Sequence, residues 1–339
     1  MTKVVMNHFP LFREFMDMFE EELSVLSGDN GKYHLERNVL YHTLMVYQAS
    51  VLSGNKLLPF VGLAHDIGKK RATKYIDDKL RMTGHEGTST ILALEFLKEY
   101  RTEMMELFSR DEILKMLYII NYHGALWQKS SKQIEKNFAM NEGLLESIKD
   151  FNLCDKSGNI SIDEHTRKEF SVKTRESVEL KDATIYILMG LPGSGKSTYI
   201  TKNYPDLEVL SRDTLLENYG EDKFGSDLTY SEIWKLLADE DQKEIDRLLQ
   251  KRFTELKRSG KDFIIDMTNL GWKTRRKWYS DSHNTIIKCF LEPFSVVEER
   301  NEKRVGKTIN GKIINSMSER LELPLIGEHR SIIDIEVLF

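Results

Sequence analysis

The stretch that decides the fold of the second half of the chain is Gly190-Leu191-Pro192-Gly193-Ser194-Gly195-Lys196-Ser197-Thr198. It fits the phosphate-binding pattern G-x-x-x-x-G-K-[ST]. The apolar residues 183–189 before it are typical of a buried strand, and residues 197–203 after it of a helix start. A glycine-rich turn between a strand and a helix directs backbone N–H groups and the positive end of the helix dipole toward one point. The sequence therefore predicts a nucleoside triphosphate site.

Within this loop, each residue type has an expected task. Lys196 is expected to reach the β- and γ-phosphates, and the Ser197 hydroxyl to ligate Mg²⁺. The residues expected to contact ATP or another nucleoside triphosphate are Gly190, Pro192, Gly193, Ser194, Gly195, Lys196, Ser197 and Thr198. The competing interpretation is a surface turn that fits the pattern by chance, and the apolar strand directly upstream argues against it.

Length and composition limit the class of protein. A chain of 339 residues exceeds the usual size of a single core, so two domains are expected. The net charge of −5 is not that of a protein that coats long nucleic acids, so a nucleic-acid partner would be gripped at one end. Two distant cysteines in apolar surroundings favour a reducing cytoplasm. No apolar run has the length of a membrane span, so no membrane partner is expected.

The hydrophobic pattern changes character between the two halves. In the first half it predicts helices, without a convincing alternating strand, over about 1–30, 35–52, 84–100, 111–122 and 131–149. From residue 183, short strand-like runs alternate with helical stretches at about 231–258 and 294–304. The expected strands are 185–189, 207–210, 263–266 and 285–291. The polar residues 160–182 mark the junction, which predicts an all-α domain over 1–170 and an α/β domain with a central parallel sheet over 171–339.

The first half also contains a group of residues suited to a metal ion. The adjacent pair His65-Asp66, with His42 upstream and Asp155 downstream, supplies two imidazoles and two carboxylates, which suit a divalent transition metal such as Mn, Co or Ni. Two adjacent residues reach one point only at a helix end, and Gly68 provides that break. A lone histidine is more often a core or surface residue, so the spacing alone leaves metal binding open.

Three segments of this half resemble the HD phosphohydrolase superfamily: 33–43, 64–69 and 84–86. They look most like the HD module of bacterial tRNA nucleotidyltransferases, which acts on 2′,3′-cyclic phosphates and 2′-phosphates. The resemblance implies that the metal ligands are His42, His65, Asp66 and Asp155, joined by His85 and His123 where two metals bind. Asp150 and Asp163 are alternatives for the distal aspartate. Lys69 is expected to stabilise charge on the phosphate, with a solvated surface lysine as the alternative.

A second group of residues surrounds the phosphate-binding loop. Asp213 follows a short predicted strand and is expected to be the general base that accepts a proton from a hydroxyl substrate; a helix N-cap is the competing role. This region resembles the bacteriophage 5′-polynucleotide kinases, which implies a lid arginine at Arg304, with Arg300 as its neighbouring candidate. Asp266 is either a second-sphere Mg²⁺ ligand or a strand-end cap.

One position departs from the phage kinases. Those enzymes carry an arginine three residues after the base, where it contacts the 3′-phosphate of the acceptor, and this chain has Leu216 there. Candidates that would compensate for the missing arginine are Arg212, Arg275 and Arg276.

An HD module followed by such a kinase resembles the bacterial HD-Pnk end-healing enzymes over nearly the whole chain. The resemblance implies a bifunctional enzyme acting on RNA or DNA strand ends: one domain removes the 2′,3′-cyclic phosphate or 2′-phosphate, and the other transfers the ATP γ-phosphate to the 5′-OH. A ligase would then seal the ends. The alternatives are a nucleoside or nucleotide kinase fused to an HD nucleotidase, and an ATP-gated regulator. The sequence leaves open whether the chain forms a homodimer.

Overall fold

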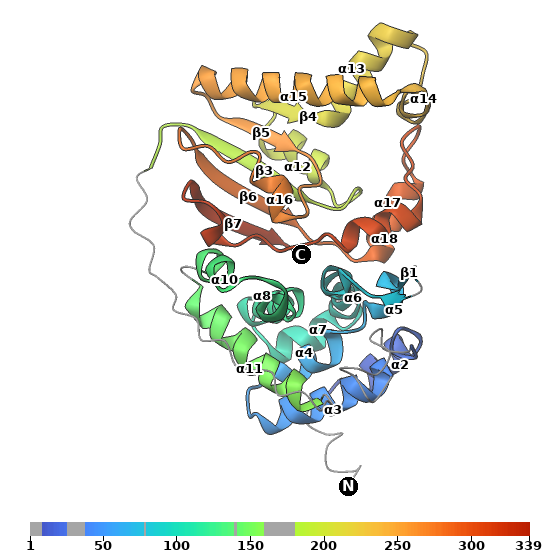
Figure 1. Cartoon of the computed structure of the whole chain (residues 1–339), viewed down its shortest axis with the longest axis vertical. Coiled ribbons are helices and arrows are strands. Elements are labelled where there is room, and N and C mark those ends of the chain that lie inside the picture. Colours follow the sequence, from blue (N-terminus) through green and yellow to red (C-terminus); the bar gives the residue numbers. More distant parts are fainter. Residues whose placement is uncertain (1–8, 26–37, 78, 139–140, 159–179) are drawn as a thin grey trace. The chain divides into compact units, whose positions relative to one another are not determined.

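A computed structural model describes residues 9–25, 38–77, 79–138, 141–158 and 180–339. The chain divides into two units (Figure 1). The first holds the described residues up to Gly158 together with Asn315–Leu323, and the second holds the described residues from 180 to Ile314 together with Pro324–Phe339. The boundary predicted at residues 170/171 lies outside the described residues, as do His34 and Asp163.

The first unit is mainly helical. Its described helices are α2 (Phe12–Leu23), α3 (Val39–Leu52), α4 (Leu58–Ala64), α5 (Lys69–Ala72), α6 (His85–Glu99), α7 (Arg101–Leu107), α8 (Arg110–Tyr122), α9 (Ala125–Gln128), α10 (Ser131–Asn137) and α11 (Glu142–Gly158). Side-chain caps set several of these starts: Asn38 accepts from the backbone of Leu40 and Tyr41 at α3, and Ser109 forms a capping box with Glu112 at α8.

Two expectations for this unit are wrong in detail. The single helix expected over 131–149 is two helices, α10 and α11, since α10 ends at Asn137, where Phe138 is fully buried. The expected absence of strands is also wrong, because an antiparallel hairpin joins β1 (Lys74–Ile76) to β2 (Lys79–Arg81). The residues of this hairpin are largely exposed on both faces, so no alternation of polar and apolar residues marks it in the sequence.

Aromatic side chains form the centre of the helical core. The rings of Phe15, Phe60 and Phe96 contact one another with centroid distances of 5.1–5.9 Å and are fully buried. They join α2, α4 and α6. Burying each ring contributes about 1.5–3 kcal/mol. This packing fixes the end of α4 relative to the start of α6.

The first unit also includes a distant part of the sequence, Asn315–Leu323, which we call the clasp segment. Asn121 of α8 donates to the carbonyl of Leu321 at 3.0 Å and accepts from the backbone of Leu323 at 2.8 Å. The Thr88 and Ser318 hydroxyls, from α6 and the clasp segment, are 3.0 Å apart. A Cβ added at Gly87 would lie 2.3 Å from the Ser318 carbonyl. The clasp segment therefore packs directly on α6 and α8.

The second unit is built on a parallel five-stranded sheet (Figure 1). Its strands, in the spatial order β4-β5-β3-β6-β7, are β3 (Thr184–Gly190), β4 (Glu208–Ser211), β5 (Phe263–Asp266), β6 (Asn284–Phe290) and β7 (Ile332–Leu338). The expected strands and the parallel sheet are confirmed to within one residue at each strand end. The fifth strand, β7, escaped prediction. Every residue of β3 is buried or half-buried, which is typical of a strand in the middle of a parallel sheet.

Helices connect these strands. They are α12 (Lys196–Asn203), α13 (Arg212–Phe224), α14 (Tyr230–Leu236), α15 (Asp239–Ser259), α16 (Trp272–Arg275), α17 (Phe294–Glu302) and α18 (Gly311–Ser318), with a 3₁₀ turn at Ile326–Glu328. The single helix expected over 231–258 is two, α14 and α15. The break falls at Leu237 and Ala238, both in extended conformation, and Asp241 caps the new start by accepting from the backbone of Ala238 at 3.0 Å.

Candidate functional sites

The phosphate-binding loop follows the central strand β3 and ends in the N-terminus of α12. Gly190 has φ = +152°, and a Cβ there would lie 2.6 Å from Ser194 Oγ. Gly195 caps α12 with φ = +94°. Since only glycine adopts such angles without strain, these two positions fix the shape of the loop.

Lys196 points into this loop. Its ammonium donates to the carbonyls of Gly190 and Leu191, both at 2.8 Å, and lies 3.3 Å from Ser194 Oγ. Burial lowers the pKa of Lys196 to about 8, and the Asp266 carboxylate opposes this shift. The loop therefore holds a cation at its centre, where a phosphate would compete with the two carbonyls.

Ser197 and Asp266 bring a hydroxyl and a carboxylate together beside the loop. Ser197 Oγ donates to Asp266 Oδ2 at 3.4 Å, and both Ser197 and Thr198 are exposed. Burial raises the pKa of Asp266. Because Asp266 ends β5, the strand next to β3, it lies where the second-sphere role predicted for it would place it.

Asp213 lies in the first turn of α13, directly after β4. It accepts from the Tyr230 hydroxyl at 3.1 Å and forms an ion pair with Lys307 at 2.8 Å, with its side chain half exposed. The cap of α13 is Ser211, whose Oγ accepts from the backbone of Thr214, so the N-cap role considered for Asp213 is wrong. Tyr230 and Lys307 escaped prediction because no local motif marks them.

The two candidate lid arginines differ in what they contact. The Arg300 guanidinium donates to the Gly193 carbonyl at 3.2 Å and to Glu292 at 2.9 Å. Arg304 follows the end of α17 and is partly exposed, and its positive charge helps to lower the pKa of Lys196. Both arginines therefore lie near the loop, and Arg300 contacts it directly.

The residues considered for holding the acceptor fall into different environments. Leu216 is fully buried against Ile233 and Ile245, so its side chain faces a core. Arg275 is also fully buried, with its guanidinium 2.5 Å from the buried Glu328 carboxylate. Its proposed compensating role is therefore wrong. Arg276 is exposed and lies over the Trp272 ring.

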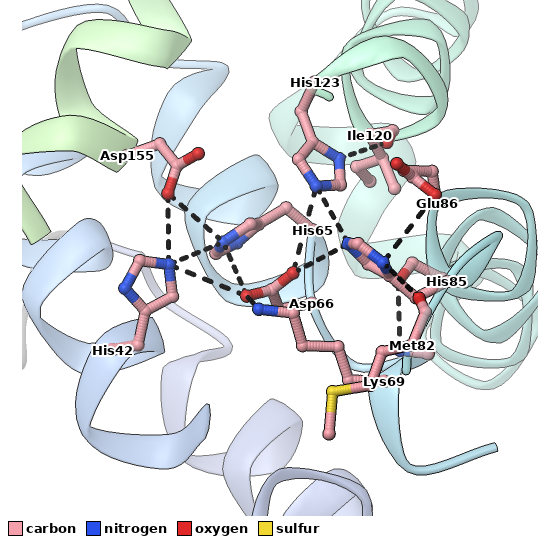
Figure 2. Close-up of polar contacts among 12 residues, drawn as sticks. His42, His65, Asp66, Lys69, Met82, His85, Glu86, Ile120, His123 and Asp155 are labelled. Atoms are coloured by element: carbon pink, nitrogen blue, oxygen red, sulfur yellow. Dashed lines mark hydrogen bonds and ion pairs between the residues drawn. The ribbon is translucent and has the colours of Figure 1, made fainter. Parts of the chain in front are cut away.

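The second site is a cluster of imidazoles and carboxylates in the first unit, which we call the His/Asp centre (Figure 2). It consists of His42, His65, Asp66, His85, His123 and Asp155. As the sequence predicts, the adjacent pair His65-Asp66 lies at a helix end, because α4 stops at Ala64. The exposed Asp150 is not part of the centre.

The centre contains two groups of three residues. In the first, His42 Nε2 lies 3.0 Å from Asp155 Oδ1 and 3.3 Å from His65 Nε2. In the second, which comprises Asp66, His85 and His123, the two histidine Nε2 atoms are 3.2 Å apart.

Asp66 lies between these groups (Figure 2). Its Oδ2 is 3.3 Å from His65 Nε2, and its Oδ1 is 3.1 Å from His85 Nε2. One carboxylate therefore faces both groups, as a bridging ligand would.

Backbone carbonyls orient three of the histidines. The Nδ1 atoms of His65, His85 and His123 donate to the carbonyls of Gly62, Met82 and Ile120 at 2.7–2.9 Å. Because a carbonyl only accepts, each Nδ1 carries the proton, and each neutral ring presents an Nε2 lone pair to the centre. Lone pairs facing each other at 3.2 Å require a cation or a proton between them. The donor set thus fits metal binding.

Charged neighbours complete the centre. Lys69 is largely buried, and its ammonium lies 2.6 Å from Asp66 Oδ2. Although burial opposes ionisation of Asp66, the His65 and Lys69 charges hold its pKa well below the usual range. Burial lowers the pKa of His123 to about 4, which keeps its ring neutral. Glu86, missed by the sequence reasoning, lies 3.7 Å from His85 Nδ1.

Comparisons with known proteins agree with the fold of the second unit. Residues 185–324 match AAA_33, the family model of an AAA domain. Similar solved structures include a proposed kinase from Chloroflexus aurantiacus J-10-fl (15% identity, 46% of this chain and 89% of that chain, TM-score 0.33). Another is a gluconokinase from Sinorhizobium meliloti 1021 (17% identity, 48% and 86%, TM-score 0.29). No curated protein matches the chain.

The second unit is thus a kinase-like P-loop domain, which implies ATP with Mg²⁺ as its ligand. No helix in the described ranges has the length and apolar character needed to cross a membrane.

Proposed function

We propose that the protein is a bifunctional nucleic-acid end-healing enzyme. In this proposal the second unit transfers the γ-phosphate of ATP to a 5′-OH strand end, and the first unit removes a 2′,3′-cyclic phosphate or a 2′-phosphate. The observation that carries the proposal is the presence of both sites in one chain: an ATP loop with Asp213 nearby, and a His/Asp centre with a shared carboxylate.

In the kinase step, residues of the second unit divide the work. Lys196 leaves the loop carbonyls for the β- and γ-phosphates, Ser197 holds Mg²⁺, and Arg304 and Arg300 neutralise charge on the transferred group. Asp213 takes the proton of the acceptor hydroxyl as the oxygen attacks the γ-phosphate. Its half-exposed carboxylate at the end of β4 supports this role, because crevice ligands bind outside the carboxyl ends of parallel strands.

In the phosphohydrolase, His42, His65 and Asp155 would hold one divalent metal ion, His85 and His123 a second, and Asp66 both. Bound there, Mn²⁺, Co²⁺ or Ni²⁺ would polarise the phosphoryl oxygens and lower the pKa of a water. Lys69, on Asp66 Oδ2, is placed to balance negative charge on the phosphate. The converging Nε2 lone pairs support this assignment without a remembered geometry.

One assay tests both activities. The purified protein is incubated with an RNA strand that carries a 5′-OH and a 2′,3′-cyclic phosphate, first with ATP and Mg²⁺ and then with Mn²⁺, Co²⁺ or Ni²⁺ added. We expect 5′-phosphorylation with Mg²⁺ and loss of the cyclic phosphate with the transition metal. If neither end changes under any of these conditions, the proposal is wrong.

The buried Leu216 favours a second candidate, a kinase for nucleosides or nucleotides fused to a nucleotidase, because no arginine replaces it beside Asp213 in the way the phage enzymes imply. Competition decides between the two. A free nucleoside or 3′-nucleotide that is phosphorylated in preference to a 5′-OH oligonucleotide would favour the small-molecule kinase.

A further inference from the structure

An unusual group of aromatic and cationic side chains lies beside Asp213. Tyr230, at the start of α14, donates its hydroxyl to Asp213, and Trp234 follows one turn later on the same helix. The two rings are nearly parallel, with an interplanar angle of 20° and centroids 6.3 Å apart. An aromatic row therefore leads away from the carboxylate that we propose as the general base.

The orientation of this row is fixed by the core beneath it. Ile233, between the two aromatic residues, is buried against Leu216 and Ile245. Thr229 and Glu232 form a capping box that holds the start of α14. Trp234 is consequently turned outward with 48% of its surface exposed, a costly placement for so large an apolar ring.

Two cations flank the row. The Arg212 guanidinium lies 5.8 Å from the Trp234 ring and is held by Asp246 at 2.9 Å and by Gln242 at 2.7 Å. The Lys307 ammonium lies 4.1 Å from the Tyr230 ring centroid, 2.8 Å from Asp213 and 3.7 Å from Glu217. An ammonium on a flexible stem has three donors, so Lys307 can keep Asp213 and still donate to a phosphate.

We propose that Tyr230, Trp234, Arg212 and Lys307 form an acceptor platform for an unpaired nucleic-acid 5′ end. The terminal nucleobase stacks on Trp234, and Lys307 donates to the phosphate that follows the terminal sugar, in the place of the arginine that Leu216 replaces. Aromatic stacking with flanking cations is how proteins hold single strands without reading sequence. The platform rests on the proposed kinase function and adds its specificity: single-stranded or overhanging 5′-OH ends are preferred over blunt duplex ends, whose bases are already stacked.

Steady-state kinase kinetics with a 5′-OH single-stranded oligonucleotide tests the platform. For Trp234→Ala we expect a KM for the oligonucleotide about tenfold higher than that of the wild-type protein, with an unchanged KM for ATP. Trp234→Phe keeps a stacking surface and should restore most of the affinity. The matched control is Trp127→Ala, because Trp127 in the first unit is equally exposed, at 47%. Thermal unfolding of each variant checks that it is folded.

The same variants separate the possible failures. The wild-type protein should phosphorylate a 5′ overhang faster than a blunt duplex, and Trp234→Ala should lose this preference. An unchanged oligonucleotide KM in folded Trp234→Ala would overturn the platform while leaving the kinase intact. If the wild-type protein phosphorylates no oligonucleotide at all, the proposed function itself fails, and the platform fails with it.

Discussion

The two sites differ in how the chain builds them. In the second unit, one unbroken run, Gly190–Thr198, forms the phosphate-binding loop between β3 and α12. In the first unit, the six side chains of the His/Asp centre come from α3, the end of α4, the start of α6, the end of α8, and α11. The loop depends mainly on backbone N–H groups and glycine angles, whereas the centre depends on how helices pack.

This difference has a consequence for their sensitivity to change. A loop whose shape is set locally tolerates changes elsewhere in its unit, while a dispersed centre depends on every helix that carries a ligand. The clasp segment makes the dependence wider, because residues from near the end of the chain pack on α6 and α8, the helices of His85 and His123. Variants that affect one site and spare the other test this contrast.

The largest effect is expected for Asp66→Ala. Since this carboxylate faces both groups of the His/Asp centre, its loss should lower the phosphohydrolase rate by about ten-thousandfold and reduce the bound transition metal. Hydrolysis of a 2′,3′-cyclic phosphate and metal analysis of the purified protein measure this. Asp150→Ala is the control, because Asp150 is exposed on the same helix as Asp155. Full phosphohydrolase activity in Asp66→Ala would break the assignment of the centre.

Lys196→Ala should lower the kinase rate by about a thousandfold, because the only cation inside the phosphate-binding loop is removed among the residues described. Transfer of label from the γ-phosphate of ATP to a 5′-OH oligonucleotide measures it. Phosphohydrolase activity should be unchanged. Lys202→Ala, an exposed lysine in the last turn of the same helix, provides the control. Loss of both activities in folded Lys196→Ala would show that the two sites are not independent.

Arg275→Met should act on stability rather than on acceptor binding. It leaves the buried Glu328 carboxylate without its ion-pair partner, which costs about 3–5 kcal/mol in the free energy of unfolding. Urea unfolding measures the change, and the exposed Arg276→Met should stay within about 0.5 kcal/mol of the wild-type protein. A stable Arg275→Met with a raised acceptor KM would instead return this residue to the acceptor site.

Gly87→Ala should have the smallest effect, on the contact between α6 and the clasp segment. The new Cβ would collide with the Ser318 carbonyl, and the shift that relieves it moves the helix that carries His85. We expect the phosphohydrolase rate to fall about tenfold with kinase activity retained. Gly143→Ala, where no atom lies within 4 Å of the added Cβ, is the control. Equal phosphohydrolase rates in the two variants would show that the clasp segment does not position the centre.

The sequence by itself determined the parts of the protein whose signal is local. A run of glycines with a lysine predicts the phosphate-binding loop because it fixes backbone angles over a few residues. Apolar runs predicted four strands of the parallel sheet, since strands buried on both faces read as continuous hydrophobic stretches. The pair His65-Asp66 with Gly68 also predicted a helix end, because adjacent side chains converge only where the helix stops.

Only the tertiary structure decided what depends on distant contacts. It separated Asp155 from the exposed Asp150, placed the Asp66 carboxylate between two groups of histidines, and brought Lys307 and Tyr230 to Asp213. It also showed that Arg275 and Leu216 face the interior, and that Asn315–Leu323 belongs with the helical unit. None of these is a property of neighbouring residues, because each results from which helix faces pack together.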